Sequence, residues 1–426
     1  MTLLLIIISS ILINYICEQK VVRLLNFTIS SLIVYYHFVG TSIVFVLLLI
    51  LLTLTTKELI YKRPFSKQIL LFLYICLCII VFISGKITYN TNLILPIGYS
   101  VVMFSGISLI IDESKTTNKY SSLESIAYLM FYPKILAGPI ERSGTFISQL
   151  NSPVDKNITS NLYIGFKTTV FGCFLKYIIT DNLIQLTFVD VTGINQFISI
   201  LLYAILFYFD FWAYSLLAVG VSKMYGIDVM MNFNNPYSAT SFKDFWNKWN
   251  ISLTTWLKDY IFIPLQRKGM TSRSLNVFIV FLVSAIWHGM TLPFLIWGLL
   301  HATFNILERN LISAKVSRTT IYKIIVVLSC ALLWQTFKVN GVKELSTTIS
   351  NLFLLSNINY TLVIILILLV ATLYMFERNW FKHYIFNIKD FKKKDIILEV
   401  LFISIMLLSL VFLNTNLGSP FHYFKY

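Results

Sequence analysis

An apolar run near the start of the chain decides its fold class: Ile29–Thr53, which reads ISSLIVYYHFVGTSIVFVLLLILLT. It carries no charge when His37 is neutral. About 20 such residues in a helix cross the hydrocarbon core of a bilayer. Backbone groups in lipid must find hydrogen bonds within the protein, and the run lacks the alternation of a barrel strand. The stretch therefore predicts a membrane-spanning helix.

The rest of the chain repeats this pattern. Hydrophobic residues make up 57% of the 426 residues and charged residues 12%, against about 45–50% and about 25% in soluble proteins. We predict an all-α, polytopic transmembrane bundle of roughly ten or eleven spans, with additional re-entrant or interfacial helices. It forms one domain over residues 1–426. The N-terminal MTLLLIIISSILINYICEQK lacks a basic start and a cleavage site, so we interpret it as the first span. Further predicted spans are Ile69–Ser84, Leu93–Ile111, Ile198–Val221, Leu275–Leu300, Ile324–Phe337, Leu362–Met375 and Ile397–Leu413.

The formal net charge of +15 is concentrated in loops. Such loops are typical of positive-inside anchoring and of contact with anionic headgroups, so we expect membrane lipids as partners and a cytoplasmic place for the longer loops. We expect no nucleic-acid partner, because no soluble domain offers a basic patch. Five cysteines lie in apolar stretches without a metal-binding spacing, so we expect no metal site. The basic loops are Lys57–Lys67, Lys243–Arg273, Arg309–Lys323 and Arg378–Lys394.

Polar segments rich in aromatic residues interrupt the spans at Tyr128–Phe146, at Asn232–Gln266 and in the last few residues. Membranes tolerate such segments where protein buries them or where they line a cavity. Phe131–Phe146 contains Gly138-Pro139, which ends any helix, and is either a plain loop or part of a site. Thr240–Leu265 carries aromatic residues at helical spacing, typical of an amphipathic helix in the interface or beside a cavity. Asn250 lies inside this pattern, and its buried amide needs partners in a structural or a functional role.

A further segment, Ser284–Ala302, reads SAIWHGMTLPFLIWGLLHA and contains two histidines. Ionisable groups in membrane spans are costly and mark functional sites, and histidine moves protons near neutral pH. His288 is therefore our candidate for the chemistry. His301 follows thirteen residues later, which puts the two side chains on different faces of one helix. His301 is thus either structural or part of a substrate site.

At these residues the sequence resembles the membrane-bound O-acyltransferase superfamily, and within it the bacterial proteins of alginate O-acetylation and D-alanyl teichoic-acid transfer. Six blocks follow the order of that family, with a motif-rich core at about residues 95–305. They are LPIGYSVVMFSGISLIID (Leu95–Asp112), LAGPIERSGTF (Leu136–Phe146), YFDFWAYSLLAVGVSKMYGI (Tyr208–Ile227), NFNNPYSATSFKDFWNKWNISLTTWLKDYIFIPL (Asn232–Leu265), IWHGMTLPFLIWGLLHA (Ile286–Ala302) and FHYFKY (Phe421–Tyr426).

The resemblance implies a helical bundle around a central tunnel, with His288 as the catalytic histidine. The acyl donor, a thioester such as acetyl-CoA or an acyl carrier, enters from the cytoplasm, and no cofactor is bound tightly. The implied acceptor is a hydroxyl of a cell-envelope or secreted polysaccharide, reached across the inner (cytoplasmic) membrane with an extracytoplasmic acyltransferase- or esterase-like partner protein. The expected substrate-binding residues are Trp246, Trp249, Asp259, Tyr214, Trp287 and His301.

The sequence also departs from these relatives. Asn250 replaces a second histidine that is usual in the bacterial branch, and we expect it to position substrate or stabilise charge. Trp212-Ala213 replaces smaller residues, and Leu216 replaces a frequent acidic one. The tail resembles an aromatic motif in which the hydroxyl of Tyr426 relays the acyl group, although an interfacial aromatic residue is the simpler interpretation. D-alanyl transfer to teichoic acid and transport of a lipid or polysaccharide without chemistry remain as alternatives.

Overall fold

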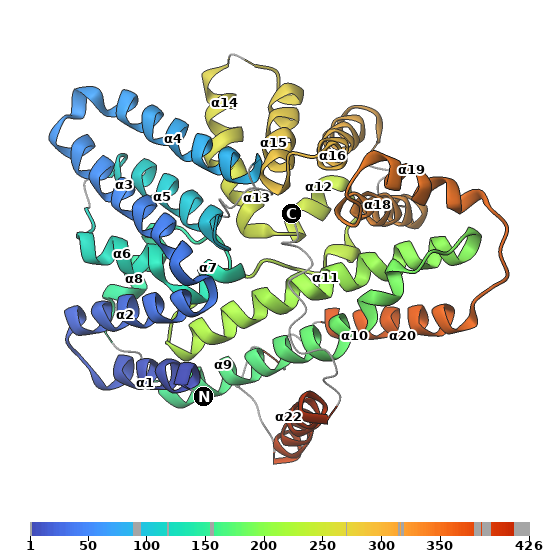
Figure 1. The fold of residues 1–426 in the computed structure, drawn as a ribbon, viewed down its shortest axis with the longest axis horizontal. Coiled ribbons are helices and arrows are strands. Elements are labelled where there is room, and N and C mark those ends of the chain that lie inside the picture. The colour runs from blue at the N-terminus through green and yellow to red at the C-terminus, as the bar shows by residue number, and fades with distance from the viewer. Residues whose placement is uncertain are drawn as a thin grey trace. The chain divides into compact units, whose positions relative to one another are not determined.

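Figure 1 shows the fold in a computed structural model, which describes residues 2–87, 95–116, 119–153, 157–269, 271–313, 316, 319–378, 385 and 393–412. These residues are mostly helical and contain no strand, which confirms the all-α prediction. Six helical segments among them are long and apolar enough to cross a membrane, and three shorter apolar helices accompany them. These apolar helices make the chain a multi-pass membrane protein. Our expectation of roughly ten or eleven spans concerns the whole chain and stays a prediction.

The chain forms two compact units. The first contains residues Met1–Thr169 and Leu217–Met230, and the second contains Val170–Leu216 and Met231–Tyr426. Our interpretation of residues 1–426 as a single domain stays a prediction. The helices of the first unit are α1 (Thr2–Ile16), α2 (Lys20–Val39), α3 (Ile43–Lys62), α4 (Lys67–Ile87), α5 (Tyr99–Glu113), α6 (Ser122–Met130), α7 (Tyr132–Ala137), α8 (Ser143–Asn151) and most of α9 (Ile158–Cys173).

The run Ile29–Thr53, which we predicted to form one span, lies within the apolar helical segment Lys20–Lys62, but a break divides that segment into two helices. Helix α2 ends at Gly40, whose φ of 58° lies in the left-handed region that favours glycine. A short 3₁₀ turn (Gly40–Ser42) then leads into α3. The apolar composition extends across this turn, which is why the sequence pattern alone does not reveal the break.

Polar contacts join the helices of the first unit. The Lys57 ammonium of α3 lies 3.0 Å from the Glu113 carboxylate of α5, and both side chains are largely buried. Helix α7 ends before Gly138-Pro139, as the sequence predicts. After it, the carboxylate of Glu141 accepts a hydrogen bond from the backbone N–H of Met230.

The second unit contains the remaining helices. They include the first part of α11 (Gly193–Met224), whose last residues belong to the first unit. Several of these helices are short, and 3₁₀ or π-helical turns interrupt the unit, such as the π-helix Phe174–Thr180. The others are α10 (Asp181–Leu183), α12 (Phe242–Lys248), α13 (Ile251–Leu257), α14 (Ile263–Lys268), α15 (Arg273–His288), α16 (Leu292–Leu311), α18 (Thr320–Leu333), α19 (Val342–Ser350), α20 (Tyr360–Glu377) and α22 (Lys393–Phe412).

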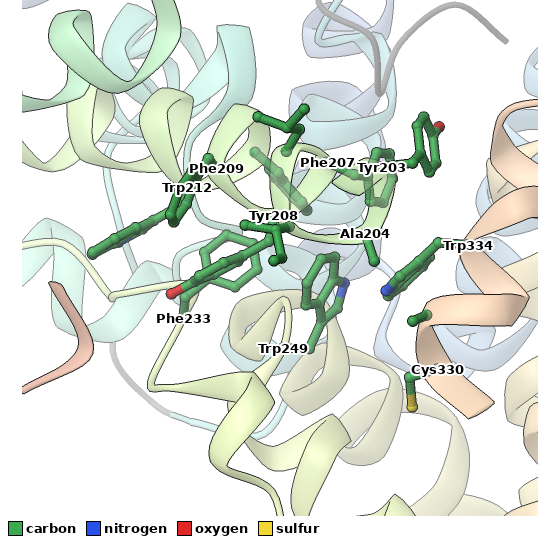
Figure 2. Close-up of a cluster of buried hydrophobic side chains, with 14 of the residues drawn as sticks. Tyr203, Ala204, Phe207, Tyr208, Phe209, Trp212, Phe233, Trp249, Cys330 and Trp334 are labelled. Carbon is green, nitrogen blue, oxygen red and sulfur yellow. The ribbon is translucent and has the colours of Figure 1, made fainter. Parts of the chain in front are cut away.

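An aromatic core fills the second unit (Figure 2). Tyr208 of α11 packs against Phe233 and Trp249, with ring centroids 5.2 and 5.8 Å away. Trp249 in turn stacks on Trp334, with centroids 4.5 Å apart and an interplanar angle of 29°. Large buried rings contribute most to the stability of such a core. These ring contacts connect α11, through Trp249, to the segment that contains Trp334.

Candidate active site around His288

His288 is the last residue of α15. The hydroxyl of Ser272 begins this helix by accepting a hydrogen bond from the backbone N–H of Leu275 (3.2 Å). The chain leaves the helix at Gly289, and α16 begins with Pro293 in its first turn. Our prediction of one span over Leu275–Leu300 is therefore wrong. Helices α15 and α16 instead lie side by side as a hairpin (Figure 1).

Gly298 allows this hairpin to be tight. A Cβ atom on Gly298 would lie 2.7 Å from the Cβ of Ala285 and 2.8 Å from the carbonyl oxygen of Phe281. Only a residue without a side chain permits so close an approach of the two backbones, as at other small-residue contacts between membrane helices. The contact sets the distance between the two helices that carry the histidines.

His288 is 9% exposed, and aromatic rings surround its imidazole. The ring of Trp287 lies 4.5 Å away between centroids, that of Phe337 4.9 Å, and that of Trp297 5.1 Å. Phe294 lies at 6.2 Å and nearly parallel to the imidazole. An imidazole in such surroundings can accept a proton from a bound hydroxyl while being largely shielded from water.

His301 lies close to His288 in space, although we expected the two to be on different faces of one helix. That expectation is wrong because the histidines belong to two helices. The ring of Trp297 lies 5.1 Å from the ring of His301 as well as from that of His288. His301 is fully buried. Its Nδ1 accepts a hydrogen bond from the indole Nε1 of Trp246 over 3.3 Å.

The loop segment after α18 supplies residues that the sequence pattern did not single out. Trp334 and Phe337 lie three positions apart in a 3₁₀ turn (Trp334–Phe337), so they share one face. Phe337 contacts His288, and Trp334 stacks on Trp249. Trp297 was also missed, although it lies in a quoted block. The sequence feature that could have indicated these residues is the presence of aromatic side chains at the end of an apolar run. We call Trp246, His288, Trp297, His301, Trp334 and Phe337 the histidine cluster.

Helix α12 positions Trp246 within this cluster. Ser241 begins the helix, and its hydroxyl accepts from the backbone N–H of Asp244 (2.9 Å). The carboxylate of Glu308 in α16 accepts from the N–H groups of Phe242 (2.9 Å) and Lys243 (3.2 Å). A negative charge at a helix N-terminus is favourable because it satisfies free N–H groups and opposes the helix dipole. Glu308 therefore holds α12 against the helix that carries His301.

Asn250 separates α12 from α13. Its φ of 42° is left-handed, a conformation that asparagine tolerates better than most residues. The next residue, Ile251, donates its backbone N–H to the carbonyl oxygen of Asn232 (2.9 Å). We expected one amphipathic helix over Thr240–Leu265, and this is wrong because the chain turns at Asn250. The Asn250 side chain is buried at this turn, and the residue before it, Trp249, belongs to the aromatic core.

A cavity of about 190 Å³ lies beside the histidine cluster. Trp246, Phe281 and Ser284 form the wall nearest the cluster, because Trp246 and Phe281 also contact His301. Exposed Lys243 and Lys258 mark its open side. The other lining residues are mostly apolar: Asn247, Leu253, Thr254, Leu257, Phe262, Val277, Val280 and Asn305. The lining is thus mostly apolar and includes two exposed lysines.

Three further predicted site residues are Asp259, Tyr214 and Tyr426. Asp259 is exposed on a π-helical turn (Lys258–Phe262). The ring of Tyr214 lies 5.4 Å from the ammonium of Lys176. That ammonium is fully buried and pairs with Asp181 (2.7 Å) and Asp210 (2.8 Å). Tyr426 lies outside the described residues. The structure thus brings together Trp246, Trp249, Trp287, His288 and His301.

Comparisons with known proteins cover the region that contains this site. A model of the membrane-bound O-acyltransferase family matches residues 106–321, just over half of the chain. The chain is similar to a probable alginate O-acetylase of Pseudomonas putida, with 34% identity over 52% of this chain and 47% of that protein. It is 31% identical to a teichoic acid D-alanyltransferase of Bacillus subtilis over 51% of this chain and 61% of the relative. A peptidoglycan O-acetyltransferase of Helicobacter pylori is 33% identical over 42% and 36%.

The matched region thus covers about half the length of the first of these relatives. It contains most of the histidine cluster, from Trp246 to His301, and the helices that position it. Its helical, multi-pass character agrees with the composition of the chain. The family match therefore falls on the residues that the geometry singles out. The chain belongs to the membrane-bound O-acyltransferase family.

Proposed function

We propose that this chain is an O-acyltransferase of the cytoplasmic membrane that moves an acetyl group from a thioester to a hydroxyl of a cell-envelope or secreted polysaccharide. The observation that carries the proposal is the burial of His288 at the end of α15, beside a cavity that can hold a thioester arm. The family match and two relatives named for O-acetylation support the reaction class.

The proposed role of His288 is that of a general base. The acceptor hydroxyl gives its proton to the imidazole as its oxygen attacks the thioester carbonyl carbon. A positioned base of this kind contributes about 10²–10⁴-fold to a rate. The ring contacts with Trp287, Trp297 and Phe337 fix the imidazole in place. In this proposal Asn250, which is held at the turn after Trp249, orients a substrate by hydrogen bonds.

The cavity beside Trp246 is the proposed entry for the donor. Its apolar wall suits the arm that carries a thioester, and Lys243 and Lys258 suit phosphate groups at the outer end. Those lysines belong to a basic segment, and in this proposal that segment faces the cytoplasm, as the positive-inside rule favours. Acetyl-CoA and an acyl carrier protein both present such an arm and such phosphates.

D-alanyl transfer is the second candidate, because one relative carries that activity in its name. A purified-protein assay separates the two. The protein is given acetyl-pantetheine or D-alanyl-pantetheine with a polysaccharide acceptor, and released thiol and labelled polysaccharide are both measured. We expect transfer from the acetyl donor. Preference for the D-alanyl donor selects the second candidate, and absence of thiol release with every thioester argues for transport without chemistry.

Tyr426 is proposed as an acyl relay towards an extracytoplasmic partner protein. The mass of the peptide that contains Tyr426 tests this, in membranes from cells that express the wild type or His288→Ala. We expect an added acetyl mass in the wild type that is lost in the variant. An unmodified peptide in both would contradict the relay and leave direct transfer to the polysaccharide.

A further inference from the structure

Three N–H donors in the histidine cluster are buried without an acceptor, those of Trp297, His301 and Trp334, and the first two lie on one helix. The indole Nε1 of Trp297 and the Nε2 of His301 have no hydrogen-bond partner, and both side chains are 0% exposed. The residues lie four positions apart in α16, so they share one face of that helix. Buried polar groups in proteins are almost always paired, so two unpaired neighbours point to a missing ligand atom.

The hydrogen bond from Trp246 defines which nitrogen of His301 carries a proton. Nδ1 accepts from the indole of Trp246, so it is unprotonated. Complete burial among the rings of Trp246, Phe281 and Trp297 favours the neutral imidazole. We therefore assign the single proton to Nε2, on the basis of this network. His301 Nε2 is thus a donor, like Nε1 of Trp297.

Two N–H donors on the same face of one helix suit an oxygen that gains negative charge. The ring of Trp297 lies 5.1 Å from that of His288 and 5.1 Å from that of His301, so both side chains belong to the surroundings of the proposed base. In an apolar site, fixed N–H donors stabilise a developing oxyanion far better than they would in water.

We propose that Trp297 Nε1 and His301 Nε2 form an oxyanion site for the carbonyl oxygen of the acyl thioester. This inference rests on the proposed function. As the acceptor oxygen bonds to the carbonyl carbon, the carbonyl π pair moves onto the oxygen between the two donors, and His288 takes the hydroxyl proton. When the carbonyl re-forms, the C–S bond breaks and the departing sulfur takes the proton from His288. The products are one ester and one free thiol.

Trp246 acts through His301 and is therefore a positioning residue. Its indole N–H holds the tautomer, and the ring of Phe281 stacks on the imidazole at 5.9 Å and 11°. These two contacts fix where Nε2 points. The oxyanion site is thereby assembled before a substrate enters, which is the condition for a large effect on rate.

A matched pair of variants at His301 tests the assignment. His301→Gln keeps an amide N–H near the position of Nε2, whereas His301→Asn keeps an acceptor near Nδ1 for Trp246 but lacks the outer donor. We expect kcat for acetyl transfer to fall about 10²–10³-fold in His301→Asn, with little change in the KM for the thioester. In His301→Gln we expect a fall of only about tenfold. Equal activities of the two variants would overturn the oxyanion site.

A spectroscopic measurement separates this inference from the proposed function. Acetyl-pantetheine with an isotope-labelled carbonyl is bound to His288→Ala, which does not turn over, and its carbonyl stretch is recorded by infrared difference spectroscopy. We expect the band at lower frequency than in water, and a return towards higher frequency in His288→Ala/His301→Asn but not in His288→Ala/His301→Gln. A band unaffected by residue 301 would overturn the site even if the wild type transfers acetyl groups. The expected band in a protein without transfer activity would support the site and contradict the proposed function.

Discussion

The indole Nε1 of Trp246 donates a hydrogen bond to Nδ1 of His301 across 3.3 Å, and this bond joins the short helix α12 to α16. Trp246 also lines the cavity that we propose for the donor. One side chain therefore contacts both the proposed donor cavity and the buried histidine. We therefore expect a substitution in the cavity wall to alter the position of His301, and a substitution at His301 to alter the cavity wall.

The first prediction concerns this bond. Trp246→Phe keeps an aromatic ring but removes the donor, so His301 is no longer held in one tautomer. We expect kcat to fall roughly five- to tenfold, since one lost hydrogen bond is worth about 1 kcal/mol. Steady-state kinetics with acetyl-pantetheine measures the effect. The same replacement at Trp256 in α13 is the control, and equal losses in the two variants would contradict a specific role for Trp246.

The second prediction concerns the close approach of α15 and α16. Gly298→Ala places a Cβ atom 2.7 Å from that of Ala285, so the helices must separate. We expect a loss of about 1–3 kcal/mol in stability, together with a loss of transfer activity because His288 and Trp297 move apart. Thermal unfolding in detergent measures the first and thiol release the second.

Gly144→Ala in α8 is the matched control for that variant. A Cβ on Gly144 would meet only the hydroxyl of Tyr120, at 3.8 Å, which is an ordinary contact. We expect this change to leave activity as it is and to stabilise α8 slightly, because alanine favours helices over glycine. An unchanged unfolding temperature in Gly298→Ala would contradict the close approach of the α15 and α16 backbones at Gly298.

The sequence predicted the helical membrane class because composition and long apolar runs are properties of the chain alone. It also indicated His288, Asn250 and Trp246, because polar residues inside apolar or aromatic stretches are conspicuous. It did not predict the turns at Gly289 and Asn250. Apolar or amphipathic patterns continue across both turns, and tertiary hydrogen bonds such as that from Ile251 to Asn232 determine the break at Asn250.

The proximity of His301 to His288 was missed for the same reason. Their spacing separates them on a single helix, whereas a hairpin brings them to the same aromatic ring, that of Trp297. Phe337 was missed because it reaches the site from a segment distant in sequence. Only the packing of α16 against the turn at Trp334–Phe337 shows that these rings share one core.

The third prediction concerns the anchor of α12. Glu308→Gln weakens hydrogen bonds to the N–H groups of Phe242 and Lys243 and to the hydroxyl of Tyr322. We expect a loss of about 1–2 kcal/mol and a lower kcat, because Trp246 is less firmly held. Glu344→Gln is the control, since that carboxylate accepts from the N–H of Asn340 beside α19. A normal kcat in Glu308→Gln would contradict the positioning of Trp246 by α12.

The fourth prediction concerns the buried ion cluster of Lys176, Asp181 and Asp210. Lys176→Met leaves two buried carboxylates without their cation. Removing one partner of a buried ion pair typically costs about 3–5 kcal/mol, so we expect poor recovery of folded protein and a lower unfolding temperature. Lys223→Met is the control, because its partner Asp228 is exposed and such pairs contribute about 1 kcal/mol or less. Similar behaviour of the two variants would contradict this account of the cluster.

The central claim is that His288 is the base for acyl transfer, and a comparison of two histidine variants tests it most directly. His288→Ala and His37→Ala are purified in detergent, with size-exclusion profiles and unfolding temperatures matched to the wild type. His37 is exposed on α2, in the other unit. Release of thiol from acetyl-pantetheine and label in the polysaccharide are then followed. We predict a loss of about 10²–10⁴-fold in His288→Ala and wild-type rates in His37→Ala. A folded His288→Ala protein that transfers acetyl groups at the wild-type rate would contradict the account.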